Sequence, residues 1–277
     1  MTDKYAVIGN RIAHSKSPLI HKMFAEQTGQ DISYEAIPAP DDGFDATVKR
    51  LRKEGYKGCN VTVPFKLQAS NLATYLTPEV LEANSANTLT FKDGAIIANN
   101  TDGAGLVRDI ELNIGVSLQG KRVLLMGAGG AARGVLMPLV FAKIQRLVIA
   151  NRTLENAEEM ILHGQRFHEN RHDMEIVAKI YSELCDEQFD IVINATSTGL
   201  TDEMLPLPDT IFAPGALAYD MMYGRETPFM KFAREQGVSI VSDGLGMLVE
   251  QAAEAFYIWR GVRPDTKLVM VKLREKA

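Results

Sequence analysis

Short apolar runs alternate with stretches of helical periodicity along the whole chain, which predicts an α/β architecture rather than a sandwich or a helix bundle. In the first part of the chain such runs predict strands at Tyr5–Gly9, Ile32–Ile37, Cys59–Val63, Asn87–Phe91 and Ala95–Ala98. An amphipathic helix is expected near Phe44–Arg52. Pro18 and Pro64 are each expected to open a helix, because proline suits the first helical position.

From residue 119 the runs become almost continuously apolar, which is typical of parallel strands buried on both faces. They predict strands at Val123–Met126, Leu147–Ala150, Ile191–Asn194, Ala216–Asp220 and Val238–Val241. Most gaps leave room for a crossover helix, so residues 119–243 are expected to form one doubly wound domain. Residues 1–118 would precede it, and residues 244–277, with a long helix at Gly246–Arg260, would return to the first domain.

Composition and charge narrow the class of protein. The 277 residues are 46% hydrophobic and 23% charged, as in ordinary globular proteins, and the net charge of -5 argues against a nucleic-acid binder. No apolar run approaches the ~18 residues of a membrane span, and the start of the chain lacks the basic region of a signal peptide. We therefore expect a soluble, cytoplasmic protein.

No metal site is expected. The two cysteines, Cys59 and Cys185, are too far apart for the usual zinc or redox spacings. His168 and His172 are four residues apart and could share a helical face as ligands. The polar and charged residues between them favour a solvated helix instead.

A glycine-rich turn directly follows the expected strand at Val123–Met126. Its residues are Gly127, Ala128, Gly129, Gly130 and Ala131, with Ala132 at the third small position of the dinucleotide fingerprint. Small residues let the backbone approach a pyrophosphate at a helix N-terminus, where free amides and the helix dipole favour negative charge. Between a buried strand and a helix, this turn indicates a dinucleotide site rather than a merely tight connection.

The residues after the next strand, Asn151, Arg152 and Thr153, indicate which dinucleotide binds. An NAD enzyme usually has Asp or Glu there to accept from the ribose hydroxyl, and this chain has neither. Arg152 offers a planar, permanently charged fork suited to the 2′-phosphate of NADP, and Thr153 can add a hydroxyl donor. A solvated arginine after a strand is the alternative interpretation.

Two serines before Pro18 are candidate ligands of an anion. In an extended backbone, Ser15 and Ser17 would project their hydroxyls to the same side and could clamp a carboxylate. A serine before proline is as often only a helix cap, so the pair alone is ambiguous.

The segment from Asn60 to Lys66 carries the strongest catalytic signal. Alternation places Asn60 and Thr62 on one face of the expected strand, and Lys66 falls in the first turn of the next helix. A cation is unfavourable at a helix N-terminus, so a lysine there suggests a functional demand for its proton. Asp102 follows the strand at Ala95–Ala98 and can cap a helix while also facing a ligand.

Two amides stand out against apolar surroundings. Gln251 shares a helical stripe with Met247 and Ala255, and a polar group on such a stripe needs a partner, such as a ligand. Asn87 is a polar residue at the start of an apolar strand.

Together these segments resemble the shikimate dehydrogenase family. The matching segments are Ser15-Lys16-Ser17-Pro18, Asn60-Val61-Thr62-Val63-Pro64-Phe65-Lys66, Ala86-Asn87-Thr88, Asn100-Thr101-Asp102-Gly103, the glycine-rich turn, Asn151-Arg152-Thr153, and Asp243-Gly244 followed by Gln251. Each segment is short, but their order and spacing are highly specific and cover nearly the whole chain.

The resemblance implies an NADP-dependent oxidoreductase that reversibly reduces 3-dehydroshikimate to shikimate in chorismate and aromatic amino-acid biosynthesis. It implies an N-terminal α/β substrate domain plus a Rossmann-type doubly wound NADP-binding domain, with the substrate in the cleft between them. We expect small-molecule partners, no nucleic acid, no membrane, and a monomer or homodimer.

The resemblance also implies roles for individual residues. Lys66 would be the acid/base and Asp102 its partner. Ser15, Ser17 and Tyr223 would hold the substrate carboxylate, and the ring hydroxyls would be bound by Thr62, Asn87, Asp102 and Gln251. Met221 and Gly244 would line the nicotinamide end of the cofactor site.

Two departures from the family pattern leave alternatives open. The family commonly reads Gly-Ala-Val-Asn-Thr at residues 84–88, which are Asn-Ser-Ala-Asn-Thr here, and Asn156 stands where many NADP-preferring relatives carry a second basic residue. One alternative is a quinate/shikimate dehydrogenase using NAD or NADP, against which Ser17 argues because quinate-using relatives often carry Thr there. The other is a non-catalytic NADP-binding regulator, against which the intact Lys66 and Asp102 argue.

Overall fold

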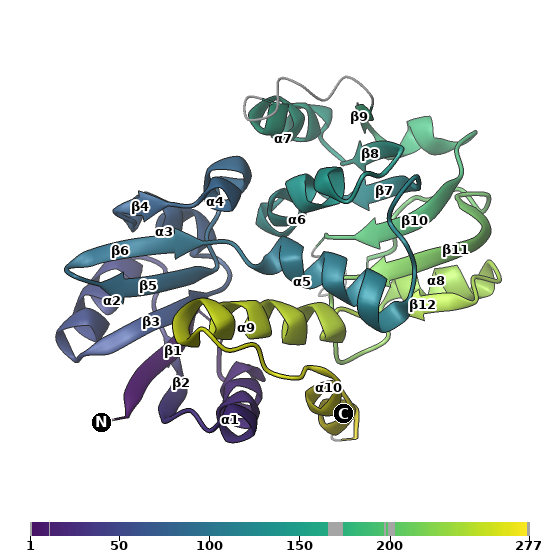
Figure 1. Cartoon of the computed structure of the whole chain (residues 1–277). Helices are drawn as coiled ribbons and strands as arrows, with labels where there is room; N and C mark the ends of the chain where they lie inside the picture. The colour runs from purple at the N-terminus through teal and green to yellow at the C-terminus, as the bar shows by residue number, and fades with distance from the viewer. Residues whose placement is uncertain (1, 11, 166–173, 197, 199–202, 276–277) are drawn as a thin grey trace. The chain divides into compact units, whose positions relative to one another are not determined.

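The chain folds into two compact units, each built on a six-stranded sheet (Figure 1). The structure is a computed structural model that describes residues 2–10, 12–165, 174–196, 198 and 203–275. One unit comprises residues 1–105 and 248–277, and the other comprises residues 106–247. The chain passes between them inside two helices, α5 (Asp102–Arg108) and α9 (Leu245–Arg260). The domain boundaries expected from the sequence, after residues 118 and 243, separate parts with different functions, and they stay a prediction.

The first unit contains a mixed sheet with the strand order β2-β1-β3-β5-β6-β4. Its strands are β1 (Asp3–Gly9), β2 (Ile32–Pro38), β3 (Tyr56–Val61), β4 (Tyr75–Leu76), β5 (Thr88–Lys92) and β6 (Ala95–Asn99). β1 runs parallel to β2 and β3, whereas β5 is antiparallel to both β3 and β6. The helices confined to this unit are α1 (Ser17–Thr28), α2 (Phe44–Lys53), α3 (Lys66–Leu72), α4 (Pro78–Ala83) and α10 (Lys267–Arg274).

Side chains of α2, α3 and α4 join those of the strands in one buried apolar cluster, which includes Ile8, Phe44, Phe65, Val80 and Leu89. A separate group of aromatic rings links β1 and β2 to α1 and to the C-terminal half of α9. In it Tyr5 stacks on Trp259 at 4.6 Å between ring centroids, and His21 stacks on Tyr34 at 4.0 Å. The first unit is therefore held together partly by aromatic contacts between segments far apart in the chain.

The second unit contains a parallel sheet with the order β12-β11-β10-β7-β8-β9. Its strands are β7 (Arg122–Met126), β8 (Arg146–Ala150), β9 (Glu175–Lys179), β10 (Phe189–Asn194), β11 (Phe212–Asp220) and β12 (Ile240–Ser242). The helical segments are α6 (Gly130–Phe141), α7 (Leu154–Gln165), α8 (Pro228–Glu235), the π-helix η1 (Asp109–Ile114) and the 3-10 helix η2 (Tyr181–Leu184). This strand order is that of the Rossmann fold and confirms the expected fold class.

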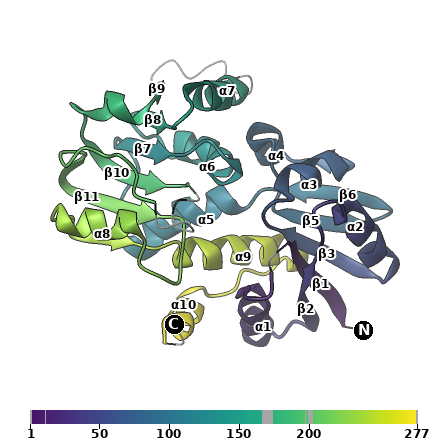
Figure 2. The same ribbon diagram turned by 180° about the vertical axis from the view of Figure 1, so that it is seen from behind.

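Alternate residues of the parallel strands point to two separate apolar cores. Val123 and Leu125 of β7 belong to the core shared with η1, α6 and α7, whereas Leu124 and Met126 belong to the core shared with η2 and α8. Figure 2 shows α8 beside β11, and α8 also contacts β12. Burial on both faces explains why these strands form continuous apolar runs in the sequence.

Two local expectations differ from the structure. The helix expected to open at Pro64 begins at Lys66, because the amide of Phe65 donates to Thr62 O in a turn and the first helical bond runs from Ala69 N to Phe65 O. The Val63–Pro64 peptide is cis. The hydrophobic pattern did not predict β9. This strand begins at the exposed Glu175, and none of its residues is fully buried.

Among the described residues, no helix combines the length and apolar character needed to cross a membrane.

His21 should make the first unit sensitive to acid. The side chain is fully buried, neither ring nitrogen makes a hydrogen bond, and burial lowers its pKa to about 3. As the pH falls below the unfolded value near 6.5, the unfolded chain gains a proton that the folded chain refuses. The stability contributed by neutral His21 is therefore present above about pH 6.5 and is lost towards pH 3, at about 1.4 kcal/mol per pH unit.

His21→Phe, which keeps a ring against Tyr34, should flatten this pH dependence by about one proton. Urea unfolding between pH 7 and pH 4, followed by the fluorescence of Trp259, the only tryptophan, measures the slope in this unit. The exposed His14→Gln variant is the control. Parallel curves for wild type and His21→Phe would contradict the assignment.

Candidate active site

Lys66 and Asp102 form an ion pair in the first unit. Lys66 is the first residue of α3 and Asp102 the first residue of α5. The Lys66 ammonium donates to Asp102 Oδ2, with side chains that are 17% and 8% exposed. A lysine placed unfavourably at a helix N-terminus is thus compensated by a nearly buried carboxylate.

Asn87, immediately before β5, holds the second oxygen of that carboxylate. Its Nδ2 donates to Asp102 Oδ1 at 2.8 Å and to Thr101 Oγ1 at 2.9 Å. Its Oδ1 accepts from Thr101 N at 2.9 Å and from Thr88 Oγ1 at 2.9 Å. Both ends of the amide are engaged, so Asn87 fixes the direction of the Asp102 carboxylate.

Gln251, one turn into the part of α9 that belongs to this unit, meets the same group. Its Oε1 accepts from Asn87 Nδ2 at 3.3 Å and from Thr101 Oγ1 at 3.4 Å, and its Nε2 donates to Leu248 O at 2.9 Å. The Gln251 amide therefore already has hydrogen-bond partners within the protein and does not depend on a ligand for them.

Asp102 does not cap its own helix. The side chain of Asn100 does so instead, since its Oδ1 accepts from Asp102 N at 3.1 Å while its Nδ2 donates to Ser85 O at 2.8 Å. The Asp102 carboxylate is consequently free to serve Lys66 and Asn87.

Thr62 lies half-buried in the turn between β3 and α3. Its amide donates to Ile8 O at 2.9 Å. A Cβ on Gly9 would lie 2.6 Å from Thr62 Cγ2, so the close approach of these two segments requires a glycine at the end of β1.

Ser15 and Ser17 do not adopt the expected extended geometry. Lys16 between them is in the right-handed helical region, and Ser17 N donates to Ser15 Oγ at 3.2 Å, as at the start of a helix. The serine before proline, Ser17, does not cap the helix either, because it is the first helical residue and the N-cap is Lys16, which makes no side-chain capping bond. The bond from Ser17 N leaves the hydrogen of the Ser15 hydroxyl available to a ligand.

Three neighbouring residues join the site without having been singled out as site residues. Asn60, Thr88 and Thr101 are all buried and all hydrogen-bonded to Asn87. Polar residues within the matched segments were the available signal, but periodicity alone does not show that they meet.

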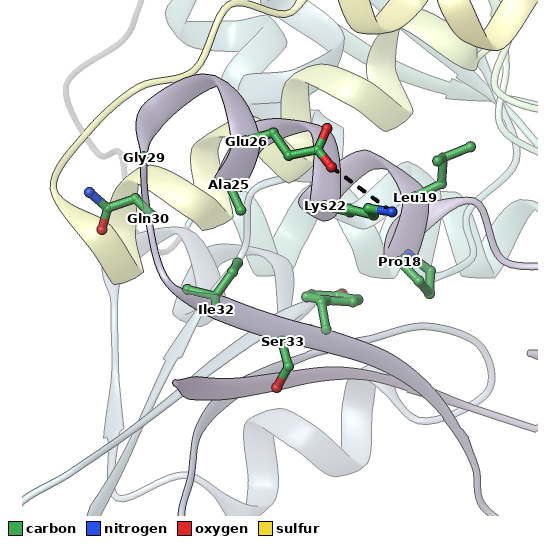
Figure 3. A pocket seen from close by; sticks show the side chains of 10 residues that line it. Pro18, Leu19, Lys22, Ala25, Glu26, Gly29, Gln30, Ile32 and Ser33 are labelled. Carbon is green, nitrogen blue, oxygen red and sulfur yellow. Dashed lines mark ion pairs between the residues drawn. The ribbon is translucent and has the colours of Figure 1, made fainter. Parts of the chain in front are cut away.

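A groove of about 630 Å³ on the surface of the first unit lies elsewhere, between α1 and β2 (Figure 3). Its charged side chains, Lys22 and Glu26, form an exposed ion pair at 3.9 Å. Apolar side chains such as Leu19 and Ile32 make up much of the rest. It offers no arrangement of acid and base comparable with Lys66 and Asp102.

The glycine-rich turn of the second unit connects β7 to α6 next to the end of β10. Gly127 has φ +105°, and a Cβ there would lie 3.2 Å from Ala195 O. Gly129 and Gly130 have nothing within 4 Å of the position of a Cβ, and no side chain caps α6. Open space in front of uncapped helical amides, at the point between β10 and β7 where the strand order reverses, fits the pyrophosphate of a dinucleotide.

Arg152 follows β8, and its side chain is 87% exposed. Its guanidinium forms an ion pair with the exposed Glu203 carboxylate at 3.9 Å. Asn151 Nδ2 donates to Thr153 O at 2.8 Å and shapes the turn before α7. An exposed guanidinium beyond the second strand fits a phosphate on the adenosine ribose. The residues present thus fit NADP.

The structure brings Met221 and Gly244 together. Gly244 N donates to Met222 O at 2.8 Å, and a Cβ on Gly244 would lie 2.2 Å from Met221 O. Only glycine permits this approach. Tyr223, two residues further along, is partly buried, and burial raises its pKa.

Over the described ranges, no group of three or more His, Cys, Asp and Glu side chains is placed to hold a metal ion. His168 and His172 lie outside the described residues.

Three family descriptions match this chain in order. They are the shikimate dehydrogenase substrate binding domain at residues 7–89, shikimate / quinate 5-dehydrogenase at residues 109–201, and the shikimate 5'-dehydrogenase C-terminal domain at residues 244–273.

Solved structures and curated proteins agree with these matches. A shikimate 5-dehydrogenase from Thermus thermophilus, in complex with NADP(H) and shikimate, has a TM-score of 0.87 at 29% identity and covers 100% of both chains. An Ael1 enzyme from Pseudomonas putida has a TM-score of 0.90 at 48% identity, covering 98% of each chain. A shikimate dehydrogenase (NADP(+)) from Methylobacillus flagellatus is 60% identical over 98% of this chain and 99% of its own. On this similarity over nearly its full length, the chain belongs to the shikimate dehydrogenase family.

Proposed function

We propose that this chain catalyses the reversible NADPH-dependent reduction of 3-dehydroshikimate to shikimate. The observation that carries the proposal is the Lys66–Asp102 pair, held by Asn87 in a chain whose second unit is a Rossmann fold with an open glycine-rich turn. Relatives at 50–60% identity bear the name of this activity.

Lys66 is the acid/base of the proposed reaction. Bound NADPH supplies the hydride equivalent, so the protein must supply one proton to the ketone oxygen. The Lys66 ammonium polarises that oxygen and releases the proton as negative charge develops on it. Asp102 orients the ammonium, and in the reverse direction the lysine takes the proton from the hydroxyl.

The remaining site residues bind and orient the two ligands. In the proposed arrangement the substrate carboxylate meets Ser15, Ser17 and Tyr223, and the ring hydroxyls meet Thr62, Asn87, Asp102 and Gln251. The pyrophosphate of the cofactor would be held by Gly127, Ala128, Gly129, Gly130 and Ala131. Asn151, Arg152 and Thr153 would hold its 2′-phosphate, and Met221 and Gly244 would line its nicotinamide end.

A cytoplasmic location and a monomeric or homodimeric state complete the proposal. The free thiols of Cys59 and Cys185 suit a reducing compartment. Size-exclusion chromatography with light scattering decides between the two oligomeric states.

Initial rates with shikimate or quinate, each combined with NADP+ or NAD+, test the proposed substrate and cofactor. With shikimate we expect NADP+ to exceed NAD+ by roughly tenfold or more, the size of one charge-assisted contact at Arg152. With either cofactor we expect shikimate to be oxidised faster than quinate. Comparable rates with quinate would support the broader dehydrogenase. No formation of reduced nicotinamide with shikimate would refute the proposal.

Removing the amine tests the role of Lys66. Lys66→Ala should lower kcat by roughly 100- to 10,000-fold, the usual contribution of a general acid/base, while shikimate binding measured by calorimetry persists. Lys53→Ala, at an exposed position in α2, is the matched control and should keep full activity. Retention of turnover by Lys66→Ala would exclude this residue as the acid/base.

Filling the open space at Gly129 tests the cofactor site. Gly129 has φ −79° and ψ −175°, which any residue adopts, so Gly129→Val should fold with an unchanged melting temperature. Its side chain would occupy the place of the pyrophosphate and raise KM for NADP+ by roughly tenfold or more, the loss of one charge-assisted hydrogen bond. Gly129→Ala should have a smaller effect, and KM for shikimate should not change. An unaltered KM for NADP+ in Gly129→Val would show that the pyrophosphate lies elsewhere.

A further inference from the structure

A chain of hydrogen bonds leads from β2, at the edge of the first sheet, to the carboxylate of Asp102. Tyr34 Oη donates to Asn60 Oδ1 at 2.8 Å. Asn60 Nδ2 donates to Thr88 Oγ1 at 2.9 Å and to Asn87 O at 3.2 Å. Asn87 Nδ2 then donates to Asp102 Oδ1 at 2.8 Å.

Chemistry fixes the direction of every bond in this chain. The main-chain oxygen of Asn87 can only accept, so the Asn60 amide must turn its nitrogen towards it and its oxygen towards Tyr34. The phenol is therefore the donor. Thr88 Oγ1, having accepted from Asn60, donates to Asn87 Oδ1 at 2.9 Å, which leaves the Asn87 nitrogen facing Asp102.

The Tyr34 hydroxyl is itself held in place and kept protonated. Its ring stacks on the fully buried His21 with 5° between the planes. Burial raises the pKa of Tyr34 well above its usual value, and the Ser17 side chain opposes part of this shift. The phenol thus remains a hydrogen-bond donor at every pH at which the protein works.

We propose that Tyr34 is a positioning residue for the reaction: its hydroxyl orients Asn60, and through Thr88 and Asn87 it fixes the carboxylate that holds Lys66. The inference rests on the proposed role of Lys66 and Asp102. The structure shows no hydrogen bond from Tyr34 to either of these residues. Removing its hydroxyl should therefore disturb the geometry of the acid/base pair without removing any group of that pair.

Tyr34→Phe tests the proposal, because it keeps the ring on His21 and deletes only the donor. We expect kcat for shikimate oxidation to fall roughly tenfold with KM for NADP+ unchanged, since misplacement of a catalytic group costs rate. The matched control is Tyr56→Phe on β3, whose hydroxyl donates to the exposed Glu35, and it should leave both measurements unchanged.

Thr88 provides a second, independent test. Thr88→Val should reproduce the loss, and Thr88→Ser, which keeps the hydroxyl, should restore kcat. In the double variant with Tyr34→Phe, the loss should be smaller than the product of the single losses, because Tyr34 acts through Thr88 and both residues act on Asn87.

Wild-type kcat in Tyr34→Phe, even with a lowered melting temperature, would overturn the proposal and leave Tyr34 a structural role. Fully multiplicative losses in the double variant would overturn the path from Tyr34 through Asn60 and Thr88. Turnover surviving in Lys66→Ala would instead locate the failure in the proposed acid/base pair.

Discussion

The first unit is arranged around a carboxylate held largely out of water at Asp102. An unpaired buried carboxylate is costly, and the charge of Lys66 together with the amide of Asn87 compensates for it. These three residues come from the start of α3, the residue before β5 and the start of α5. Because β5 is antiparallel to both β3 and β6, the end of β3, the start of β5 and the end of β6 lie at the same end of the sheet, and these positions meet there.

The second unit obeys a different constraint, the need for empty space at the ends of its parallel strands. The chain turns closely past Ala195 at Gly127 and then leaves the amides of α6 uncapped at Gly129 and Gly130. A side chain at these points would fill the space or clash with the neighbouring segment. In the second unit glycines keep this space open, whereas in the first unit polar side chains are brought close together.

Much of the fold could be predicted because burial leaves a record in the sequence. The continuous apolar runs at β7, β8 and β10 and the glycine-rich turn predicted the parallel sheet, and the structure confirms it. β9 was missed because it lies at the edge of the sheet, where none of its residues is fully buried and its apolar run is short. The start of α3 was misplaced because the turn that ends at Phe65 depends on main-chain bonds that proline alone does not reveal.

The candidate site was predictable in its residue types and less so in its geometry. Lys66 and Asn87 stood out as polar groups where local preference disfavours them, and Asp102 stood out as a helix cap that could also face a ligand. The structure brings the three together. The same reasoning gave Ser15 and Ser17 an extended geometry, whereas Lys16 between them adopts a helical conformation that orders the turn by a local bond.

The sequence by itself determined the period of most elements and the chemical groups available, since these depend on neighbours along the chain. Tertiary structure alone decided that Tyr34 meets Asn60 and that Gln251 meets Asn87. Such contacts join residues whose separation is set by strand order and helix packing. Their donors and acceptors are ordinary polar atoms until burial removes water as the competing partner.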